Sequence, residues 1–148
     1  MAQDPYRTFK AQAAQALSKA LAELGVATEP ALDRPPEGMG DLAFPCFPLA
    51  KTMRKAPNVI AQELAARIVP GGMVERVEAK GGYVNFHVRF EDLAQAALED
   101  AVARKERFGA GDPKGVRTLL EHTSANPTGP LHVGRARNPI IGDTIARI

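Results

Sequence analysis

The sequence predicts an α+β protein in which helices pack on a small antiparallel sheet, followed by one strand, a loop and one helix of a second domain. Three observations predict this fold. Apolar residues recur at helical spacing in several stretches of the first 110 residues. Two strand-like stretches, 74–80 and 83–90, are joined by the turn-forming pair Gly81-Gly82. Near the end, an apolar run precedes a loop rich in proline and glycine and then a helical stretch, the arrangement at which α/β sheets bind nucleotides.

The first helix is predicted to begin at Asp4 and Pro5, a capping side chain followed by the residue whose fixed φ suits the first turn. Gly25 ends it. Its apolar residues share one face: Phe9, Ala13, Leu17, Ala20, Leu21 and Leu24. We expect this face to lie on the core, because an alanine-rich face buries too little apolar surface in lipid for a membrane-surface helix.

The next stretch is mostly irregular. Residues 26–32 have room for a short strand, and residues 33–40 are expected to form a loop because they contain two prolines and two glycines. Residues 41–51 are apolar but contain two prolines, which exclude a regular helix before about the second of them, Pro48. A second core-facing helix is predicted over 57–69.

The second strand of the predicted hairpin alternates between two faces. The apolar face, expected to be core, carries Val84, Phe86, Val88 and Phe90. The other face carries Tyr83, Asn85, His87 and Arg89. This face is either solvated or contacts and stacks on RNA, and the sequence leaves both open. Another amphipathic helix is predicted over 93–108.

Composition bounds the class of protein. The 148 residues carry a formal net charge of +2, which permits an RNA partner without requiring one. The basic cluster of Lys51, Arg54 and Lys55 is either a solvated face or touches RNA phosphate. The single Cys46 suggests a reducing compartment, and a packed apolar role is favoured over a reactive thiol. The polar N-terminus and the lack of a long apolar run predict a cytoplasmic protein with no signal peptide and no membrane span.

Two domains are predicted. Residues 1–110 form an α+β domain, residues 111–115 a linker, and residues 116–148 the start of a second domain. The apolar run 116–120 is read as a buried strand. Because one strand and one helix cannot form a doubly wound sheet, we expect the chain to stop just inside this second domain.

The loop between that strand and the last helix offers an anion site. Residues His132 and Gly134 open the helix, whose N-terminus presents backbone N–H groups and a positive dipole end. Arg135 and Arg137 add guanidinium groups that can fork onto phosphate. From spacing alone, a nucleotide site and an ordinary strand-to-helix loop rich in turn formers remain equally open.

Residues 126–134, Asn-Pro-Thr-Gly-Pro-Leu-His-Val-Gly, resemble the HIGH signature of class I aminoacyl-tRNA synthetases, and the wider string 121–143 resembles arginyl-tRNA synthetase in particular. The resemblance implies that a Rossmann-like catalytic domain begins at residue 116. It implies ATP-dependent activation of arginine, with Mg²⁺, and transfer to tRNA by a monomeric enzyme. It also implies that the N-terminal domain contacts the tRNA elbow.

Site residues follow from this resemblance. His132 and Gly134 would lie against ATP, and Arg135, which replaces the usual histidine, would keep a cationic donor there. The imidazole of His132 and the guanidinium of Arg135 would act catalytically by stabilising charge on phosphate. Ser124 and Asn126 resemble positions that hold the amino and carboxylate groups of arginine.

Further residues near the signature have weaker assignments. Glu121 resembles an acidic position near the substrate, and His122 is expected to pack beneath the loop. Pro139 predicts a kink, or a helix that begins afresh with Asn138 as its cap. No metal-ligating residues are predicted.

Three functions remain open from the sequence. The first is the N-terminal part of an arginyl-tRNA synthetase, which is inactive without the rest of the enzyme. The second is a free-standing tRNA-binding module without catalysis. The third is an interaction fragment without a site, which a dimer built around Phe44 and Phe47 would support.

Overall fold

The computed structural model describes residues 4–124, 129 and 132–147, and for Arg135 the backbone alone. The chain divides into two compact units, Met1–Lys105 and Glu106–Ile148, called here the N-terminal unit and the C-terminal unit. The predicted end of the first domain, near residue 110, lies a few residues beyond this division.

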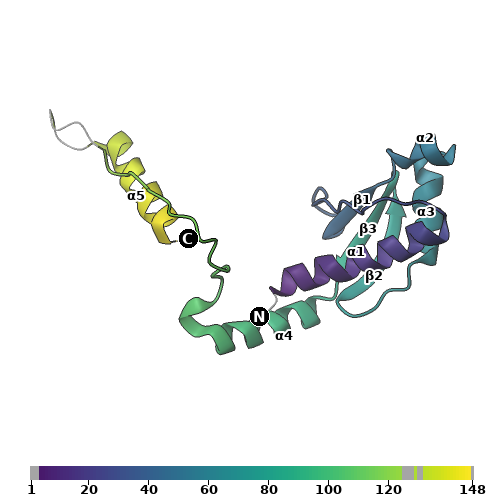
Figure 1. Cartoon of the computed structure of the whole chain (residues 1–148), viewed down its shortest axis with the longest axis horizontal. Coiled ribbons are helices and arrows are strands. Elements are labelled where there is room, and N and C mark those ends of the chain that lie inside the picture. Colours follow the sequence, from purple (N-terminus) through teal and green to yellow (C-terminus); the bar gives the residue numbers. More distant parts are fainter. Residues whose placement is uncertain (1–3, 125–128, 130–131, 148) are drawn as a thin grey trace. The chain divides into compact units, whose positions relative to one another are not determined.

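The N-terminal unit contains three strands and four α-helices among its described residues, followed at its end by a short 3-10 turn over Lys105–Arg107 (Figure 1). In chain order the elements are α1 (Pro5–Glu23), β1 (Leu42–Pro45), α2 (Leu49–Met53), α3 (Pro57–Arg67), β2 (Val74–Lys80), β3 (Tyr83–Val88) and α4 (Phe90–Arg104). The α+β class predicted for this part is confirmed.

Helix α1 begins as predicted. The Asp4 side chain accepts a hydrogen bond from the backbone N–H of Tyr6 (3.0 Å), and Pro5 occupies the first turn. Five of the six residues on the predicted core face are buried: Phe9, Ala13, Leu17, Ala20 and Leu21. Leu24 is partly buried and packs against the same core.

The sheet has the order β1-β3-β2, and both pairs are antiparallel. The predicted hairpin is confirmed, because Lys80 pairs with Tyr83 and both glycines of the turn have positive φ (59° and 84°). Strand β1 was not predicted. It is short and ends in Pro45, which is tolerated because β1 lies at a sheet edge.

The possible strand over 26–32 does not form. Only the neighbouring Asp33 makes a single bridge, to Ala43 of β1. Helix α2 begins after Pro48, as the prolines required.

Two predictions for β3 are wrong. Phe90 begins α4 instead of ending the strand, and its side chain is 72% exposed, so it does not belong to the core face. Asn85, on the face expected to be solvated or bound to RNA, is fully buried, and neither polar atom of its side chain has a hydrogen-bond partner among the described residues. Val84 and Phe86 are fully buried as predicted.

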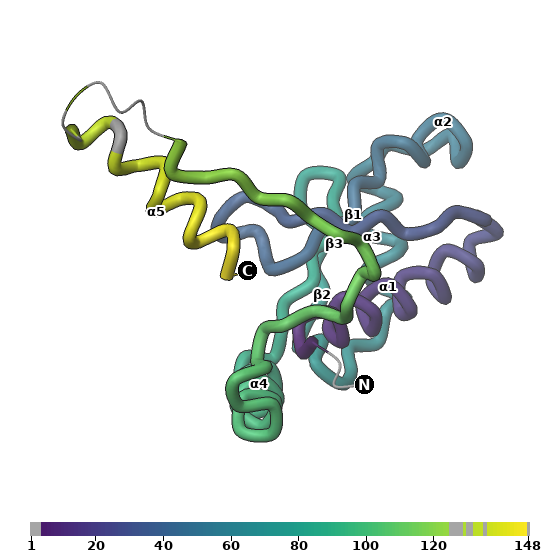
Figure 2. Tube along the Cα trace, turned by 60° about the vertical axis from the view of Figure 1, so that its left-hand side comes forward, coloured from purple at the N-terminus to yellow at the C-terminus, as the bar shows by residue number. Residues whose placement is uncertain are grey.

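The core lies where α1 and α3 pack on each other and on the sheet (Figures 1 and 2). Cys46 is part of this core, and burial raises the pKa of its thiol to about 11. A thiol with so high a pKa holds almost no reactive thiolate near neutral pH, which fits the packed role.

In the C-terminal unit, residues 110–124 form an extended segment whose last part runs beside helix α5 (Val133–Arg147; Figures 1 and 2). The predicted strand over 116–120 is not formed, because no described residue pairs with it and a strand needs a neighbour for its hydrogen bonds. Leu119 is accordingly 97% exposed.

Helix α5 runs through Pro139, so the predicted fresh start at Asn138 is wrong. Its first helical residue is Val133, directly after His132. Within the described part of the chain, none of the helices combines the length and the apolar character that crossing a membrane requires.

Candidate functional sites

His132 caps the N-terminus of α5. Its carbonyl oxygen accepts the N–H of Ala136 (3.2 Å), and its Nδ1 accepts the N–H of Gly134 (3.2 Å). Because Nδ1 acts as the acceptor, a neutral ring carries its proton on Nε2, which remains a donor. The side chain is exposed, so this donor and the positive end of the helix are open to the same anion.

Gly134 allows this cap. A Cβ atom built on Gly134 would lie 3.1 Å from Cε1 of the His132 ring, tighter than ordinary van der Waals contact. Asn126 lies outside the described residues, and of Arg135 the structure describes the backbone in the first turn of α5 but not the side chain.

The extended segment places Glu121 and Ser124 together. The Ser124 hydroxyl donates to Oε1 of Glu121 (2.6 Å), and both side chains are exposed. Between them Thr123 has a φ of 66°, a left-handed conformation that is rare for a β-branched residue. The turn at Thr123 therefore accompanies the pairing of two predicted substrate-binding side chains.

His122 lies against Gly142 of α5, and its side chain is exposed, while most of the loop beneath which it is predicted to pack lies outside the described residues. Its side chain fills the space next to Gly142, and its Nδ1 lies 2.7 Å from the Thr123 hydroxyl. A cavity of about 380 Å³ lies between the segment and the helix. The segment residues 120–124 line one wall, and Asn138, Ile141, Gly142 and Ile145 line the other.

A second candidate site lies on the sheet of the N-terminal unit. Arg76 Nη2 donates to Nδ1 of His87 (3.2 Å), and His87 Nε2 donates to Oε1 of Glu78 (3.1 Å). Arg76 Nη1 closes the cluster by donating to Oε2 of Glu78 (3.0 Å). The hydrogen bond from His87 lowers the pKa of the Glu78 carboxyl despite some desolvation, and the nearby positive charges lower it further.

Arg76 and Glu78 were missed in the sequence. They could have been found from the register of the hairpin, because Arg76 pairs with His87 and Glu78 is its diagonal neighbour. His87 is therefore not an isolated surface histidine.

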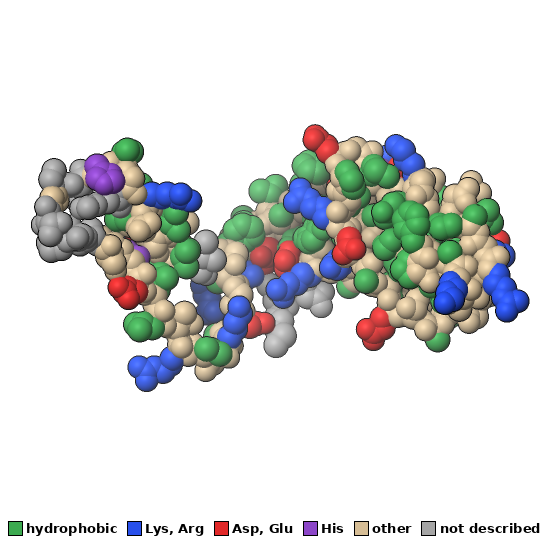
Figure 3. All heavy atoms as spheres, turned by 90° about the horizontal axis from the view of Figure 1, so that it is seen from above, with side chains coloured by type: hydrophobic (Ala, Val, Ile, Leu, Met, Phe, Trp, Pro, Cys, Tyr) green, Lys and Arg blue, Asp and Glu red, His purple; other side chains and the backbone are tan. Residues whose placement is uncertain are grey.

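An aromatic pair stands at the end of the hairpin. The rings of Phe47 and Tyr83 meet edge to face with centroids 5.1 Å apart, and the Phe47 side chain is about half exposed. In the nearby basic cluster, Lys51, Arg54 and Lys55 are all exposed, and Lys55 donates to both carboxylate oxygens of Glu63 (2.6 and 2.8 Å). On the face drawn in Figure 3, basic and acidic side chains are interspersed, so no single basic patch dominates it.

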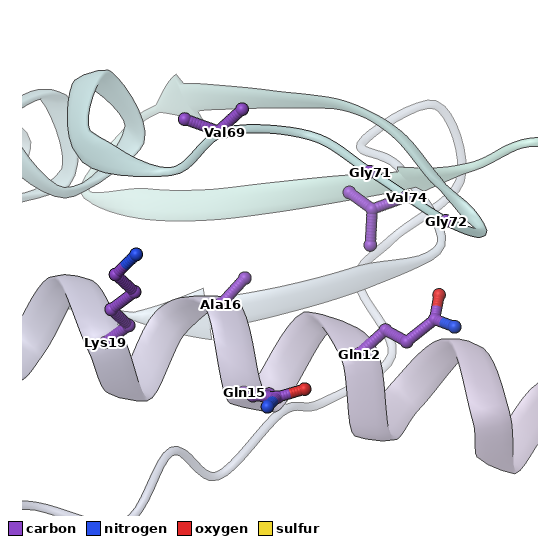
Figure 4. A pocket seen from close by; sticks show the side chains of 8 residues that line it. All are labelled: Gln12, Gln15, Ala16, Lys19, Val69, Gly71, Gly72 and Val74. Atoms are coloured by element: carbon purple, nitrogen blue, oxygen red, sulfur yellow. The ribbon is translucent and has the colours of Figure 1, made fainter.

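A further cavity, of about 420 Å³, lies between α1 and the loop that joins α3 to β2 (Figure 4). In this view Gln12, Ala16 and Lys19 rise from α1 toward that loop. The Gln12 side-chain oxygen accepts the N–H of Met73 (2.8 Å), and a Cβ on Gly72 would lie 2.6 Å from that oxygen. Gln12 therefore ties the loop to α1.

Comparison with known proteins identifies the family of this chain. Residues 8–88 match the family described as Arginyl tRNA synthetase N terminal domain, and they make up more than half of the chain. The chain belongs to this family. The predicted resemblance to arginyl-tRNA synthetase is confirmed.

Individual relatives support the same family assignment. An arginine–tRNA ligase of Methanococcus maripaludis (strain C6) is 42% identical over 119 residues, 79% of this chain and 21% of the relative. One of Clostridioides difficile (strain 630) is 44% identical over 115 residues, 77% of this chain and 20% of the relative. The structure of Thermus thermophilus arginyl-tRNA synthetase superposes with a TM-score of 0.56 at 41% identity, covering 91% of this chain and 22% of that one. The chain thus spans about a fifth of the length of these relatives.

Proposed function

We propose that the chain is the N-terminal part of an arginine–tRNA ligase, a cytoplasmic enzyme that activates arginine with ATP and transfers it to tRNA. The observation that carries this proposal is the 41% identity to the Thermus thermophilus synthetase over 91% of the chain. So large a share includes residues from both units.

The C-terminal unit supplies part of the ATP site. The Nε2 donor of His132 and the N-terminus of α5 would receive phosphate oxygens, and Gly134 keeps the backbone accessible. Arg135 would add a fixed positive charge, and Mg²⁺, when bound with ATP, would neutralise further phosphate charge. These groups would favour adenylate formation by binding the transition state more strongly than ATP itself.

The extended segment supplies part of the arginine site. Glu121 accepts one hydrogen bond from Ser124 at Oε1, and a cationic group of the substrate would bind its carboxylate as well. The Ser124 hydroxyl and the Asn126 amide would hold the amino and carboxylate groups of arginine. Glu121 and Ser124 come from the extended segment, and Asn126 follows it in the sequence.

The N-terminal unit would bind tRNA. The sheet face presents Tyr83 and the Arg76–Glu78–His87 cluster, groups that can stack on bases or donate to RNA. The amide of Asn85 on the same face has no hydrogen-bond partner among the described residues, which supports a role beyond packing, because a buried polar group without a partner is costly.

A free-standing tRNA-binding module is the second candidate. The family match, residues 8–88, lies wholly within the N-terminal unit, which has its own core. Such a module would bind tRNA without activating arginine.

The two candidates differ in catalysis. We expect residues 1–148 alone to bind tRNA with strong salt dependence and to show no ATP–pyrophosphate exchange. Joined to the remainder of the Thermus thermophilus enzyme, they should restore arginine-dependent exchange. Binding without restored exchange would favour the module, and exchange by residues 1–148 alone would contradict the proposed division of the catalytic site.

His132 offers a sharper test in that joined enzyme. His132→Ala should lower the rate of adenylate formation by about 100-fold, with a smaller change in ATP binding, because its contact matters most in the transition state. Pre-steady-state measurement of adenylate formation at several ATP concentrations separates the rate of adenylate formation from the affinity for ATP. Equal losses in rate and binding would argue against this role.

A further inference from the structure

Gly142 is buried in α5, and it is the only described residue of the C-terminal unit that is buried. A Cβ atom at this position would overlap the Cβ and Cγ atoms of His122. The imidazole of His122 thus occupies the space that any side chain at position 142 would need. The extended segment can lie this close to the helix only because residue 142 is glycine.

Glycine at this position has an energetic cost. Inside a helix it is less favourable than alanine by about 1 kcal/mol, because it loses more backbone freedom. No positive φ requires glycine here, since Gly142 has helical backbone geometry. The close approach of His122 is the contact that would be lost with alanine.

The residues on either side of His122 are the ones that this contact fixes. Glu121 precedes it, and Thr123 follows it with its hydroxyl on the His122 ring and its backbone in the left-handed region. Ser124 then turns back to bond Glu121. Gly142 follows His132 by roughly three helical turns. Helix α5 therefore connects the His122 contact to the cap that faces the anion site.

We infer that Gly142 is a positioning residue: through its contact with His122 it holds the segment carrying Glu121 and Ser124 in register with α5, and so sets the arginine side of the site relative to the ATP side. This inference rests on the proposed function for the identity of the two substrates. The contact itself does not depend on that identity, so the two can be tested separately.

The contact is tested in the 148-residue chain. We expect nuclear Overhauser effects between the His122 ring protons and the α-protons of Gly142, and their loss in Gly142→Ala. Thr144→Ala is the matched control, because it raises helix propensity two residues away without touching His122. Absence of these effects in the unsubstituted chain would overturn the inference.

The role is tested in the joined enzyme. Gly142→Ala should lower kcat/KM for arginine about tenfold or more, because a displacement of about 1 Å in a substrate-positioning group is sufficient for such a loss. KM for ATP should change by no more than about twofold, the scatter expected for an independent site. A merely destabilising substitution would reduce the amount of active enzyme, and so would lower the apparent kcat/KM for arginine and for ATP by the same factor while leaving both KM values unchanged.

A second substitution provides rescue. His122→Gly removes the atoms that the new Cβ would meet, so adding Gly142→Ala to it should cost no more than about twofold. Equal effects on both substrates, or an undiminished loss in the His122→Gly background, would contradict the inference. If the unsubstituted joined enzyme lacks arginine-dependent exchange, the proposed function fails, and the contact in the 148-residue chain still decides whether Gly142 holds the segment.

Discussion

The two units differ in what holds their candidate residues in place. In the N-terminal unit, the candidate tRNA-binding face lies on a sheet backed by a core of buried apolar side chains from α1, α3 and all three strands. In the C-terminal unit, Gly142 alone is buried among the described residues, and caps and short hydrogen bonds set the geometry. Substitutions in the first should therefore act through global stability, and those in the second through local position.

The largest expected effect tests this difference directly. Phe86→Ala removes a fully buried ring from the central strand and should lower the free energy of unfolding by about 3–5 kcal/mol. Leu119→Ala, at a 97% exposed position of the C-terminal unit, should change it by less than about 0.5 kcal/mol. Urea denaturation followed by far-ultraviolet circular dichroism measures both. A large cost for Leu119→Ala would mean that the C-terminal unit has its own apolar core.

Asn85 is the exception within the well-packed unit. Asn85→Leu keeps the shape of the side chain but removes two buried groups without partners, so it should raise the free energy of unfolding by about 1–2 kcal/mol. The same variant should weaken tRNA binding if the amide serves that partner. Urea titration and a filter-binding assay at low salt measure the two effects.

Asn138→Leu, at an exposed position of α5, is the control for the leucine itself. If Asn85→Leu instead lowered the free energy of unfolding of the N-terminal unit, the amide of Asn85 would stabilise that unit, as its apolar core does.

Sequence reasoning succeeded where local rules determine structure. Asp4 with Pro5 gave the start of α1, and Gly81-Gly82 gave the hairpin, because caps and two-residue turns depend on neighbouring residues alone. It failed where distant residues decide. β1 exists because β3 pairs with it, and residues 116–120 stay extended because no described strand lies beside them. Phe90 does not continue the alternation of β3 because it is the first residue of α4.

The candidate sites show the same division. The position of His132 at the head of α5 could be read from the sequence, since the helix start is local. The His87 cluster needed the strand register, and the contact of His122 with Gly142 needed the path of the extended segment along α5. The sequence near His122 does not predict where the segment runs along α5. A glycine inside a predicted helix was the one feature of the sequence that indicated a close approach there.

Helix caps allow the two units to be compared with the same kind of interaction. Asp4→Ala should lower the free energy of unfolding of the N-terminal unit by about 1 kcal/mol, the usual cost of a lost cap. His132→Ala should fray the first turn of α5 and leave the stability of the N-terminal unit unchanged.

Carbon chemical shifts of residues 133–137 report the fraying, and urea titration reports the stability. His132→Asn is the matched variant, because asparagine is a good capping residue and should preserve the turn. A loss of stability in the N-terminal unit on His132→Ala would show that the two units unfold together.

The smallest expected effect concerns pH and the cluster on the sheet. The hydrogen bond from His87, with further help from nearby positive charges, lowers the pKa of Glu78 below its ordinary value of 4.5. A carboxyl whose pKa is lower in the folded state stabilises that state above its ordinary pKa, and the contribution is lost as pH falls through the lowered value. Glu78→Gln should therefore reduce the urea midpoint slightly at about pH 7, and this reduction should diminish as the pH falls below the ordinary pKa of 4.5 toward about pH 3. The change should be small because the Glu78 side chain is 37% exposed.

Glu75→Gln, on the same strand and exposed, is the control. An equal difference between Glu78→Gln and the unsubstituted chain at both pH values would mean that the charge on Glu78 contributes nothing to the N-terminal unit, and that its cluster, like the contacts of the C-terminal unit, sets local geometry alone.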